Sequence, residues 1–600
     1  NIAYNILPYL TFRVQGSYYT SNGKNERFYN KNTPQGSPLN IQSSKGVYGT
    51  INFSEYNSLL NDNTLTFDKI YNKVHKVNVV GGMTYQTTNI SGFGYSSQNI
   101  ENDYLYMYAL DEGTPFEPIA YGGENVLLSY FGRVNYSFNS KYLFTATFRA
   151  DGSSKFSKEN RWGYFPSVAV AWNIKEENFM KNIKLISNSK LRLSYGETGN
   201  NRVGNYDYLK QMSKYIYSSY SFNNGTPIQG TIPINIANTA LKWETTAQTN
   251  VGYDLGLIDD RIELTVDWYK KNTRDLLLLA DMPASSGTTR AYKNIGEISN
   301  TGLEFALKTI NISTPKFSWT SNFNISFNRN EIISLTRDQD KLFTSVNVPG
   351  ANINLYVSQI GAPAGMFYGY IFDGIYQIED FDSPAEGVYI LKPNLSDNGT
   401  QRSTIQPGHI KYKDLNNDGT INSQDMTVIG RGQPFHYGGF TNNFYYNGFS
   451  LNIFFQWSYG NKIYNANRNI FEGNNQMNLG MNSYASYIDR WTPENRSNTL
   501  YIPTGRGPLG YASTRVLEDG SYLRLKTLSL GYSLPEKILK NLSISELTFR
   551  IAVQNLLTWT KYTGMDPEVS TLRNQVLSPG YDYSGYPQAR TTTFGISLTL

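Results

Sequence analysis

The sequence predicts an all-β fold, a transmembrane antiparallel β-barrel, because three patterns agree. Apolar and polar residues alternate along many segments, which places the two kinds on opposite faces of a strand. These segments are long enough to cross a bilayer, and tyrosine and tryptophan gather at their ends. Turn-forming residues separate several neighbouring segments, so that successive strands pair as hairpins.

The alternation recurs from the start of the chain to its end. In residues 10–17, Leu, Phe and Val alternate with Thr, Arg and Gln. In residues 317–328, mostly aromatic and aliphatic residues alternate with Ser, Thr and Asn. In residues 449–458 the same pattern holds, except that Phe454 falls among the polar positions. Each segment is therefore a strand whose two faces meet different surroundings.

Strand length separates the two architectures that fit this alternation. Strands of soluble β-sandwiches usually contain ~5–6 residues, whereas a strand that crosses a bilayer needs ~9–11. Most of the alternating segments reach the longer value, which favours the barrel. Aromatic residues at strand ends fit the interfacial girdles of such a barrel, although they would also suit an ordinary sheet core. They include Tyr18, Tyr19, Tyr136, Trp172, Trp268, Trp457 and Tyr459.

Short turns and long connections differ clearly along the chain. Asn447 and Gly448 supply the positive φ angles of a tight hairpin turn, and residues 139–141 and 258–260 link two further strand pairs. Long stretches without alternation cover approximately residues 197–241, 330–434 and 459–519. We therefore expect residues 1–600 to form one barrel domain in which these stretches are long extracellular loops.

Charged residues in step with the polar positions are predicted to face a water-filled lumen. A charge on the lipid face would cost ~2–4 kcal/mol at the bilayer centre. Near Thr527 the pattern changes phase, because Leu528 and Leu530 fall on the side of Arg524 and Lys526; this predicts a β-bulge. The lumen candidates are Arg133, Arg149, Asp151, Arg192, Glu263, Asp267 and Glu304.

Composition excludes several classes of protein. The chain has no cysteine and only three histidines, so disulfide scaffolds and thiolate metal sites are ruled out. The net charge of +5 is spread without a basic run, which argues against nucleic acid as a partner. No apolar stretch approaches the ~20 residues of a membrane-spanning helix. The motifs of serine hydrolases, zinc proteases and P-loop enzymes are missing, so we expect no catalytic residues and no enzymatic activity.

Several phrases of the sequence resemble the SusC/RagA-type TonB-dependent outer-membrane transporters of Bacteroidetes. Each phrase alone is weak, but their order over several hundred residues makes the resemblance specific. The phrases are SYFGRVNY at 129–136, KYLFTATFRADGSSKF at 141–156, GYFPS at 163–167 with AW at 171–172, LRLSYG at 191–196 with TGN at 198–200, NIGE at 294–297, NTGLE at 300–304, FYGY at 367–370 with DGIYQ at 373–377, and DGSYLRLK at 519–526.

This resemblance implies a barrel of about 22 strands around an N-terminal plug, with a TonB box upstream. No plug is recognisable in the sequence, so we interpret the chain as the C-terminal barrel portion of a longer transporter that lacks the plug and the first strands. Roughly sixteen to eighteen segments qualify as strands.

The resemblance also implies a function. It is active import of oligosaccharides or oligopeptides across the bacterial outer membrane, with a SusD-like surface lipoprotein as lid. TonB–ExbB–ExbD would act through the region that this chain lacks. The sequence leaves open whether the cargo is a glycan or a peptide. The alternatives are a siderophore- or cobalamin-type TonB-dependent receptor and a non-transporting surface β-barrel or structural protein.

Residues 414–425 have the spacing of a calcium-binding loop. Side-chain oxygens stand at loop positions 1, 3, 5, 9 and 12 and glycine at position 6. This pattern predicts structural Ca²⁺ as the one candidate ion, with no other cofactor. The alternative is an Asx-rich surface turn that binds nothing. The candidate ligands are Asp414, Asn416, Asp418, Thr420, Asn422 and Asp425.

Aromatic residues in the first long connection are candidates for substrate contact. Tyr215, Tyr217, Tyr220 and Phe222 precede Asn223-Asn224-Gly225. Aromatic rings stack on sugars and pack against peptides. The same residues could simply order a long loop.

Overall fold

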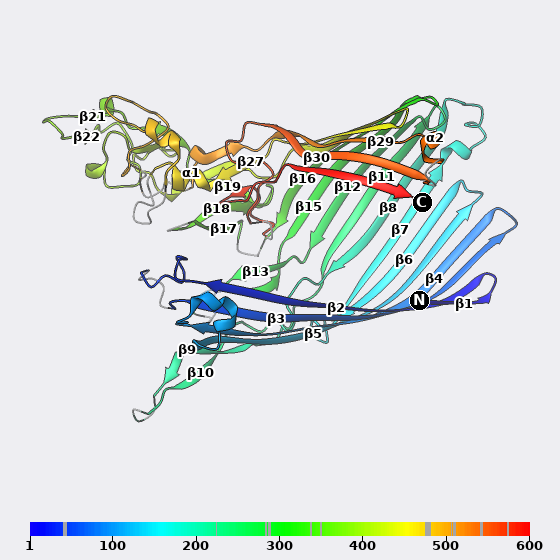
Figure 1. Cartoon of the computed structure of the whole chain (residues 1–600), viewed down its shortest axis with the longest axis horizontal. Coiled ribbons are helices and arrows are strands. Elements are labelled where there is room, and N and C mark those ends of the chain that lie inside the picture. The colour runs from blue at the N-terminus through cyan, green and yellow to red at the C-terminus, as the bar shows by residue number, and fades with distance from the viewer. Residues whose placement is uncertain are drawn as a thin grey trace. The chain divides into compact units, whose positions relative to one another are not determined.

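The computed structural model describes most of the chain and consists chiefly of antiparallel strands (Figure 1). The described residues are 1–39, 45–221, 223, 225–282, 285, 290–335, 339–348, 351–473, 482–505, 507, 512–540, 544–572 and 575–599. Within these ranges, no helix is long and apolar enough to cross a membrane.

The main sheet contains 17 strands in the described part of the chain, in line with the number of alternating segments. They are β1 (Ile2–Leu7), β2 (Leu10–Tyr29), β3 (Tyr48–Tyr71), β4 (His75–Gln98), β5 (Thr114–Phe138), β6 (Tyr142–Ser153), β7 (Trp162–Asn173), β8 (Ile186–Asn200), β11 (Glu244–Leu257), β12 (Ile262–Arg274), β15 (Glu297–Ser313), β16 (Phe317–Ser334), β25 (His436–Tyr446), β26 (Phe449–Tyr459), β29 (Tyr522–Ser533), β30 (Glu546–Thr560) and β32 (Thr591–Thr599).

The chain divides into two compact units. Unit 1 comprises Asn1–Glu176, Arg192–Thr249 and Thr273–Ile295, and in it β1 to β7 pair in chain order, each antiparallel to the next. Unit 2 comprises Glu177–Leu191, Asn250–Asn272 and Gly296–Leu600. Its strands β15, β16, β25, β26, β29, β30 and β32 pair antiparallel in that order.

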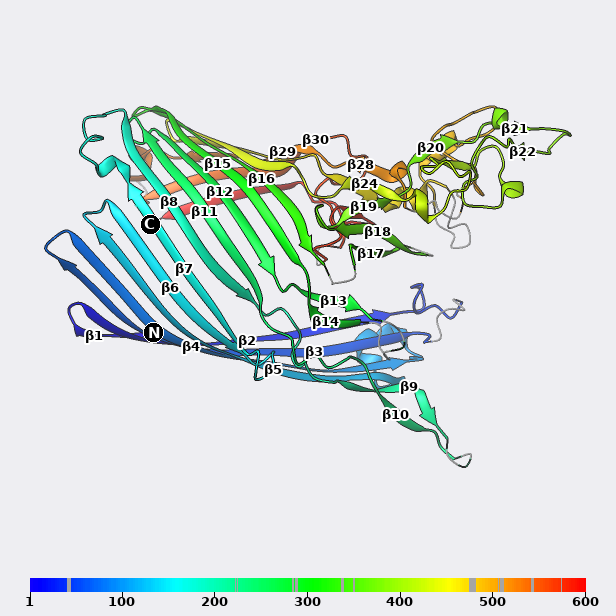
Figure 2. The ribbon, with the colours of Figure 1, turned by 180° about the vertical axis from the view of Figure 1, so that it is seen from behind.

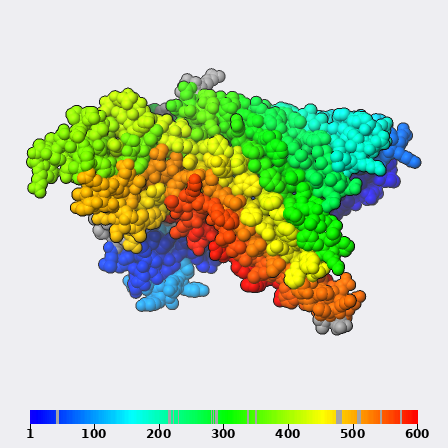
Figure 3. Space-filling view, turned by 90° about the horizontal axis from the view of Figure 1, so that it is seen from above, coloured from blue at the N-terminus to red at the C-terminus, as the bar shows by residue number. Residues whose placement is uncertain are grey.

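The register explains why the alternating sequence forms this sheet. Residues paired directly across neighbouring strands share a face. One row runs Leu307, Phe323, Phe440, Phe455 and Leu525, and the adjacent row runs Ala306, Asn324, Gly439, Gln456 and Arg524. The first row belongs to an apolar face and the second to a polar face. Figure 3 shows the green surface of β15 and β16 next to the yellow surface of β25 and β26.

The exceptional Phe454 lies on the polar face, where it pairs with Thr441. Its ring covers Gly439 closely, since a Cβ atom added to this glycine would lie 2.9 Å from Phe454 Cε2. A glycine on the neighbouring strand thus makes room for the aromatic ring.

The predicted turns and the predicted bulge are confirmed. Asn447 and Gly448 have φ angles of 45° and 87°, as a tight hairpin turn requires. Against β26, the pairing shifts between Leu525 and Thr527, so that Lys526 is the extra residue. This bulge returns Leu528 to the apolar face, opposite Ile453, and keeps both basic residues on the polar face.

The long connections contain their own short elements, which the lack of alternation did not predict. Figure 2 shows those of unit 2, including the sheet of β17, β18, β19 and β24. The elements are β9 (Met212–Tyr220), β10 (Ile228–Pro233), β13 (Leu277–Asp281), β14 (Arg290–Asn294), β17 (Lys341–Val348), β18 (Ala351–Gln359), β19 (Met366–Gly369), β20 (Phe372–Ile375), β21 (Phe381–Asp382), β22 (Ile390–Leu391), β23 (Ile410–Tyr412), β24 (Thr427–Arg431), β27 (Lys462–Asn465), α1 (Ala466–Phe471), β28 (Leu517–Asp519), α2 (Glu536–Leu539) and β31 (Tyr581–Asp582).

The buried core of unit 2 lies in these connections. Tyr356, Phe367 and Tyr464 are fully buried together with Val516 and Tyr581. Burial raises the pKa of Tyr356 well above its usual value, and its hydroxyl donates a 2.9 Å hydrogen bond to the carbonyl of Pro579. Segments more than 200 residues apart in sequence are thereby packed around one apolar centre.

Candidate functional site

A buried arginine fastens the connection between β30 and β32 to the polar face of the sheet. Arg524, on β29, is 2% exposed. Its Nη2 lies 2.7 Å from Asp566 Oδ1, its Nη1 also bonds Glu568, and its Nε donates to Thr558 Oγ1 at 2.9 Å. We call the described residues that follow β30, 561–572 and 575–590, the strap.

The charges around Arg524 balance. Lys526 Nζ, brought to this face by the bulge, lies 3.4 Å from Glu568 Oε2. The other oxygen of Glu568 accepts hydrogen bonds from Tyr522 (2.9 Å) and Gln456 (3.2 Å). Two cations thus face two carboxylates, and the neutral donors Tyr522 and Gln456 provide further hydrogen bonds to Glu568. Buried charges persist when they are paired and hydrogen-bonded in this way.

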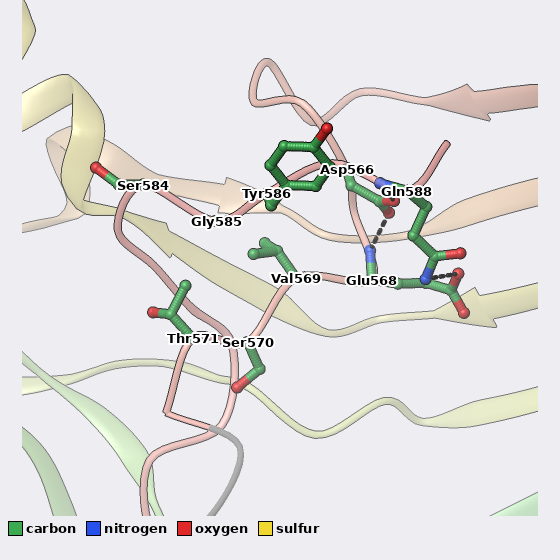
Figure 4. Close-up of a pocket in the computed structure, with 9 residues that line it drawn as sticks. All are labelled: Asp566, Glu568, Val569, Ser570, Thr571, Ser584, Gly585, Tyr586 and Gln588. Carbon is green, nitrogen blue, oxygen red and sulfur yellow. Dashed lines mark hydrogen bonds between the residues drawn. The ribbon is translucent and has the colours of Figure 1, made fainter. Parts of the chain in front are cut away.

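The strap carries a pocket beside this network, with a volume of about 270 Å³. Figure 4 shows that two stretches, residues 566–571 and 584–588, supply its lining. Tyr586 presents its ring almost completely to solvent, with 94% exposed. Gly585 lets the two stretches approach, because a Cβ atom there would lie 2.6 Å from Val569 Cγ2.

The pocket offers hydrogen-bonding groups of several kinds. Ser570, Thr571 and Ser584 contribute hydroxyl groups to the lining. Gln588 donates through Nε2 to Glu568 Oε2 at 3.3 Å, and the backbone N–H of Glu568 donates to Asp566 Oδ1 at 2.8 Å. An exposed ring next to hydroxyl, amide and charge-balanced carboxyl groups suits a polar organic ligand.

A second buried ionic network orders the connection that contains α1. Arg515 Nη1 lies 3.0 Å from Glu472 Oε2, and Arg468 contacts both Glu472 (2.9 Å) and Glu518 (3.2 Å). Burial alone would lower the pKa of Arg468, but the two glutamates outweigh it and raise that pKa. Thr563, at the start of the strap, donates to Glu518, so the strap is tied to this network as well.

The lumen candidates lie on main-sheet strands, and some of them are paired. On β6, Arg149 Nε lies 2.7 Å from Asp151 Oδ1. Glu263 of β12 forms an ion pair with Lys308, with 2.7 Å between Oε1 and Nζ. The remaining candidates lie on β5 (Arg133), β8 (Arg192), β12 (Asp267) and β15 (Glu304).

The 414–425 loop forms a chain of Asx turns. Asp414 accepts hydrogen bonds from the N–H groups of Asn417 (2.7 Å) and Gly419 (2.8 Å), and Asp418 accepts one from Thr420 (2.8 Å). Asp425 is fully buried and accepts from Leu415 and Asn422. Among the described residues, no group of three His, Asp or Glu side chains is arranged to hold a metal. The calcium site stays a prediction.

Only part of the aromatic group in the first connection can be placed. Tyr220 ends β9, is 65% exposed and pairs with Ile228 of β10. Tyr215 and Tyr217 also belong to β9, but their side chains lie outside the described residues, as does Phe222 altogether. Their role in substrate contact stays a prediction.

The sequence did not identify Arg524, Asp566 and Glu568 as one site. The partners are 42 and 44 residues apart, and no local pattern links them. Two features of the sequence could have indicated this site. They are the two basic residues near the predicted bulge and the two acidic residues of Asp566-Pro567-Glu568.

Comparison with known proteins identifies the family of the chain. Residues 2–390 match the family described as TonB dependent receptor-like, beta-barrel. The chain belongs to this family. This TonB-dependent receptor barrel is 35% identical, over 99% of its length, to TonB-dependent receptor P3 of Formosa agariphila, of which it covers 57%. It is 32% identical, over 80% of its length, to TonB-dependent receptor SusC of Bacteroides thetaiotaomicron, of which it covers 44%.

Structural comparison agrees on the fold. The structure of the RagAB peptide transporter matches 99% of this chain with a TM-score of 0.80 and 24% sequence identity, and the chain covers 60% of that protein. Together these matches confirm the resemblance to SusC/RagA-type transporters. The TonB-dependent receptor barrel described here spans less than two thirds of the length of these relatives.

Proposed function

We propose that this protein imports oligosaccharides or oligopeptides across the bacterial outer membrane in a TonB-dependent manner, beneath a SusD-like surface lipoprotein. The observation that carries the proposal is its kinship with SusC, at 32% identity over 80% of the chain. The RagAB peptide transporter, which shares the fold, supports a peptide as the alternative cargo to a glycan.

In this proposal the apolar face of the sheet contacts outer-membrane lipid and the polar face lines the transport path. Asn324, Gln456 and Arg524 are part of that polar face. Such groups form hydrogen bonds that replace those between a polar oligomer and water, so entry costs little free energy. An apolar lining would leave the polar groups of the oligomer without hydrogen bonds.

The strap provides a contact point for the cargo. Tyr586 offers a flat apolar ring on which the C–H face of a sugar or a peptide side chain can stack. Ser570, Thr571 and Ser584 offer hydroxyl groups for hydrogen bonds to sugar hydroxyls or peptide groups. Because Arg524 and Lys526 neutralise Asp566 and Glu568, the pocket favours a polar ligand without demanding a charge.

The energy for import comes from outside these residues. TonB–ExbB–ExbD would act on an N-terminal region of the intact transporter, and the barrel wall and strap would stay fixed during transport. The network around Arg524 supports this fixed role, because releasing the strap would leave two carboxylates unpaired.

Purification from native outer membranes in mild detergent tests the proposal directly. We expect mass spectrometry to find a stoichiometric SusD-like lipoprotein and a bound oligosaccharide or oligopeptide. A ferric chelate or cobalamin in their place would support the siderophore- or cobalamin-type receptor instead. A protein with neither cargo nor lipoprotein would support the non-transporting alternative.

Two tyrosine variants then locate the cargo contact. Tyr586→Ala should lower the rate of uptake of the identified cargo, since it removes the exposed ring of the strap pocket. Tyr220→Ala tests the rival contact, because it removes another exposed ring, which lies on the β9–β10 hairpin. If only the Tyr220 variant impairs uptake, the contact lies in the first connection and not at the strap.

A further inference from the structure

The apolar face of unit 2 carries a groove where β12, β15, β16 and β25 approach their long connections. The groove has a volume of about 520 Å³. Its floor is aromatic and aliphatic, and two arginines line it at the connection end; Thr301, Gly302, Asn328 and His436 complete the lining. The floor residues are Trp268, Leu303, Phe305, Phe327 and Phe435.

The first arginine, Arg329, lies on the apolar face itself. It follows Phe323 and Phe327 in the alternation of β16 and pairs with Thr301 of β15. It lies two residues beyond Phe327, which places it about 7 Å further along the strand toward the long connection. A cation on this face belongs at the level of lipid headgroups, because the bilayer core excludes it.

The second arginine, Arg431, reaches the groove from the end of β24. Its guanidinium lies 4.4 Å from the ring centre of Phe435 and donates to the carbonyls of Gln433 (2.9 Å) and Pro434 (3.2 Å). Burial lowers the pKa of Arg431, and the positive charge of Arg329 lowers it further. The two cations are therefore close enough to repel each other.

No carboxylate in the described chain compensates this repulsion. Neither arginine forms an ion pair with an acidic residue of these ranges, and Glu331, on the same face of β16, pairs with neither. Elsewhere in unit 2, buried arginines such as Arg524 and Arg515 have acidic partners at 2.7–3.0 Å. Two close cations above an apolar groove complement an anion that carries an apolar tail.

We propose that this groove binds a phosphorylated lipid of the surrounding membrane leaflet, whose phosphate contacts Arg329 and Arg431 and whose acyl chain lies along the aromatic floor. The proposal rests on the membrane location of the proposed function. Guanidinium groups suit the phosphate because they donate two parallel hydrogen bonds, and Trp268 suits the boundary between acyl chains and headgroups.

Native mass spectrometry of the purified, delipidated protein tests this site. The probe is bis-phosphorylated lipid A, compared with the same lipid after its phosphates have been removed and with inorganic phosphate alone. We expect one retained lipid A per protein, weak retention of the dephosphorylated lipid and no retention of inorganic phosphate. Retention of inorganic phosphate alone, or equal retention of both lipids, would overturn the proposal.

Variants assign the binding to the two arginines. Arg329→Gln and Arg431→Gln should each weaken lipid A binding about fivefold, and the double variant about twenty-five-fold, since each cation near a phosphorylated surface contributes comparably. The matched control is Arg550→Gln, which removes an exposed arginine on the polar face of β30. The double variant with Arg329→Lys and Arg431→Lys should keep much of the affinity for lipid A. This result would show that the protein folds with both arginines replaced.

The outcomes separate this inference from the proposed function. Full binding by the double glutamine variant, with the protein still in the outer membrane, would overturn the lipid site and leave the transporter untouched. A protein that does not fractionate with the outer membrane would overturn both.

Discussion

The main-sheet strands and their long connections are stabilised in different ways. On the strands, side chains of both faces are mostly half-exposed or exposed, and order comes from a continuous hydrogen-bonded register. The twelve largest fully buried side chains of the described chain all lie in the connections. Six of them are tyrosines, including Tyr356, Tyr464 and Tyr581.

This difference reflects the two surroundings. A transmembrane strand needs no protein core, because lipid covers one face and its backbone groups are satisfied by neighbouring strands. A long connection in water has to bury its own apolar surface and to pair its buried charges. The wall is thus held by the register of its strands, whereas the connections fold much as a soluble domain does.

The largest effect should come from removing a buried cation. Arg524→Met leaves Asp566 and Glu568 short of their shared partner, and we expect a loss of about 3–5 kcal/mol in the local stability of the strap. Proteolysis and hydrogen exchange should show the strap released while β25 and β26 remain protected.

The matched control is an exposed ion pair of the wall. Lys308→Met breaks the pair with Glu263, whose side chains are 52% and 45% exposed, and should cost less than about 1 kcal/mol. Equal effects of the two variants would contradict the distinction between wall and connections.

A turn variant tests the register of the wall. Gly448→Ala should destabilise the β25–β26 hairpin by about 1–3 kcal/mol, since φ is 87° and the new Cβ would lie 2.6 Å from the carbonyl oxygen of Ser533. The measurement is the temperature at which the barrel loses its resistance to detergent unfolding. Gly16→Ala on β2 meets no atom within 4 Å and should leave that temperature unchanged.

The connection that contains His409 should also respond to acid. Burial lowers the pKa of His409, so the native connection disfavours the protonated imidazole. An unfolded segment binds this proton near pH 6.5, so stability is complete above that pH and falls as the pH decreases below it. Hydrogen exchange around residues 405–412 should be faster at pH 5 in the wild type than in His409→Gln. Equal exchange of the two at pH 5 would exclude this histidine as the cause.

The smallest expected change concerns the 414–425 loop. If it binds Ca²⁺, calcium should slow proteolysis of this loop relative to chelator, and Asp414→Asn with Asp418→Asn should abolish the difference. Identical cleavage of the wild type in calcium and in chelator would leave the loop as a set of Asx turns, which already satisfy Asp414 and Asp425.

The sequence predicted the wall better than the connections for a physical reason. Alternation reflects the surroundings of each side chain, so it identified the strands, the Asn447-Gly448 turn and a bulge near Thr527, which the structure places at Lys526. It cannot record partners that are distant in sequence. Tyr356 meets Pro579 across 223 residues, and Arg524 meets Asp566 across 42, so neither the buried tyrosine centre nor the strap site was predicted.

Spin labelling around the bulge tests most directly that this sheet is a membrane wall with one lipid face and one water face. Residues 1–600 contain no cysteine, so a single cysteine introduced in place of Leu525, Lys526, Thr527 or Leu528 is the only residue among them that the spin label modifies. We expect labels at 525 and 528 to collide with oxygen dissolved in lipid, and labels at 526 and 527 with a water-soluble nickel complex. Labels at 525 and 528 that reach neither reagent would contradict the membrane wall, because they would indicate the buried core of a soluble sheet.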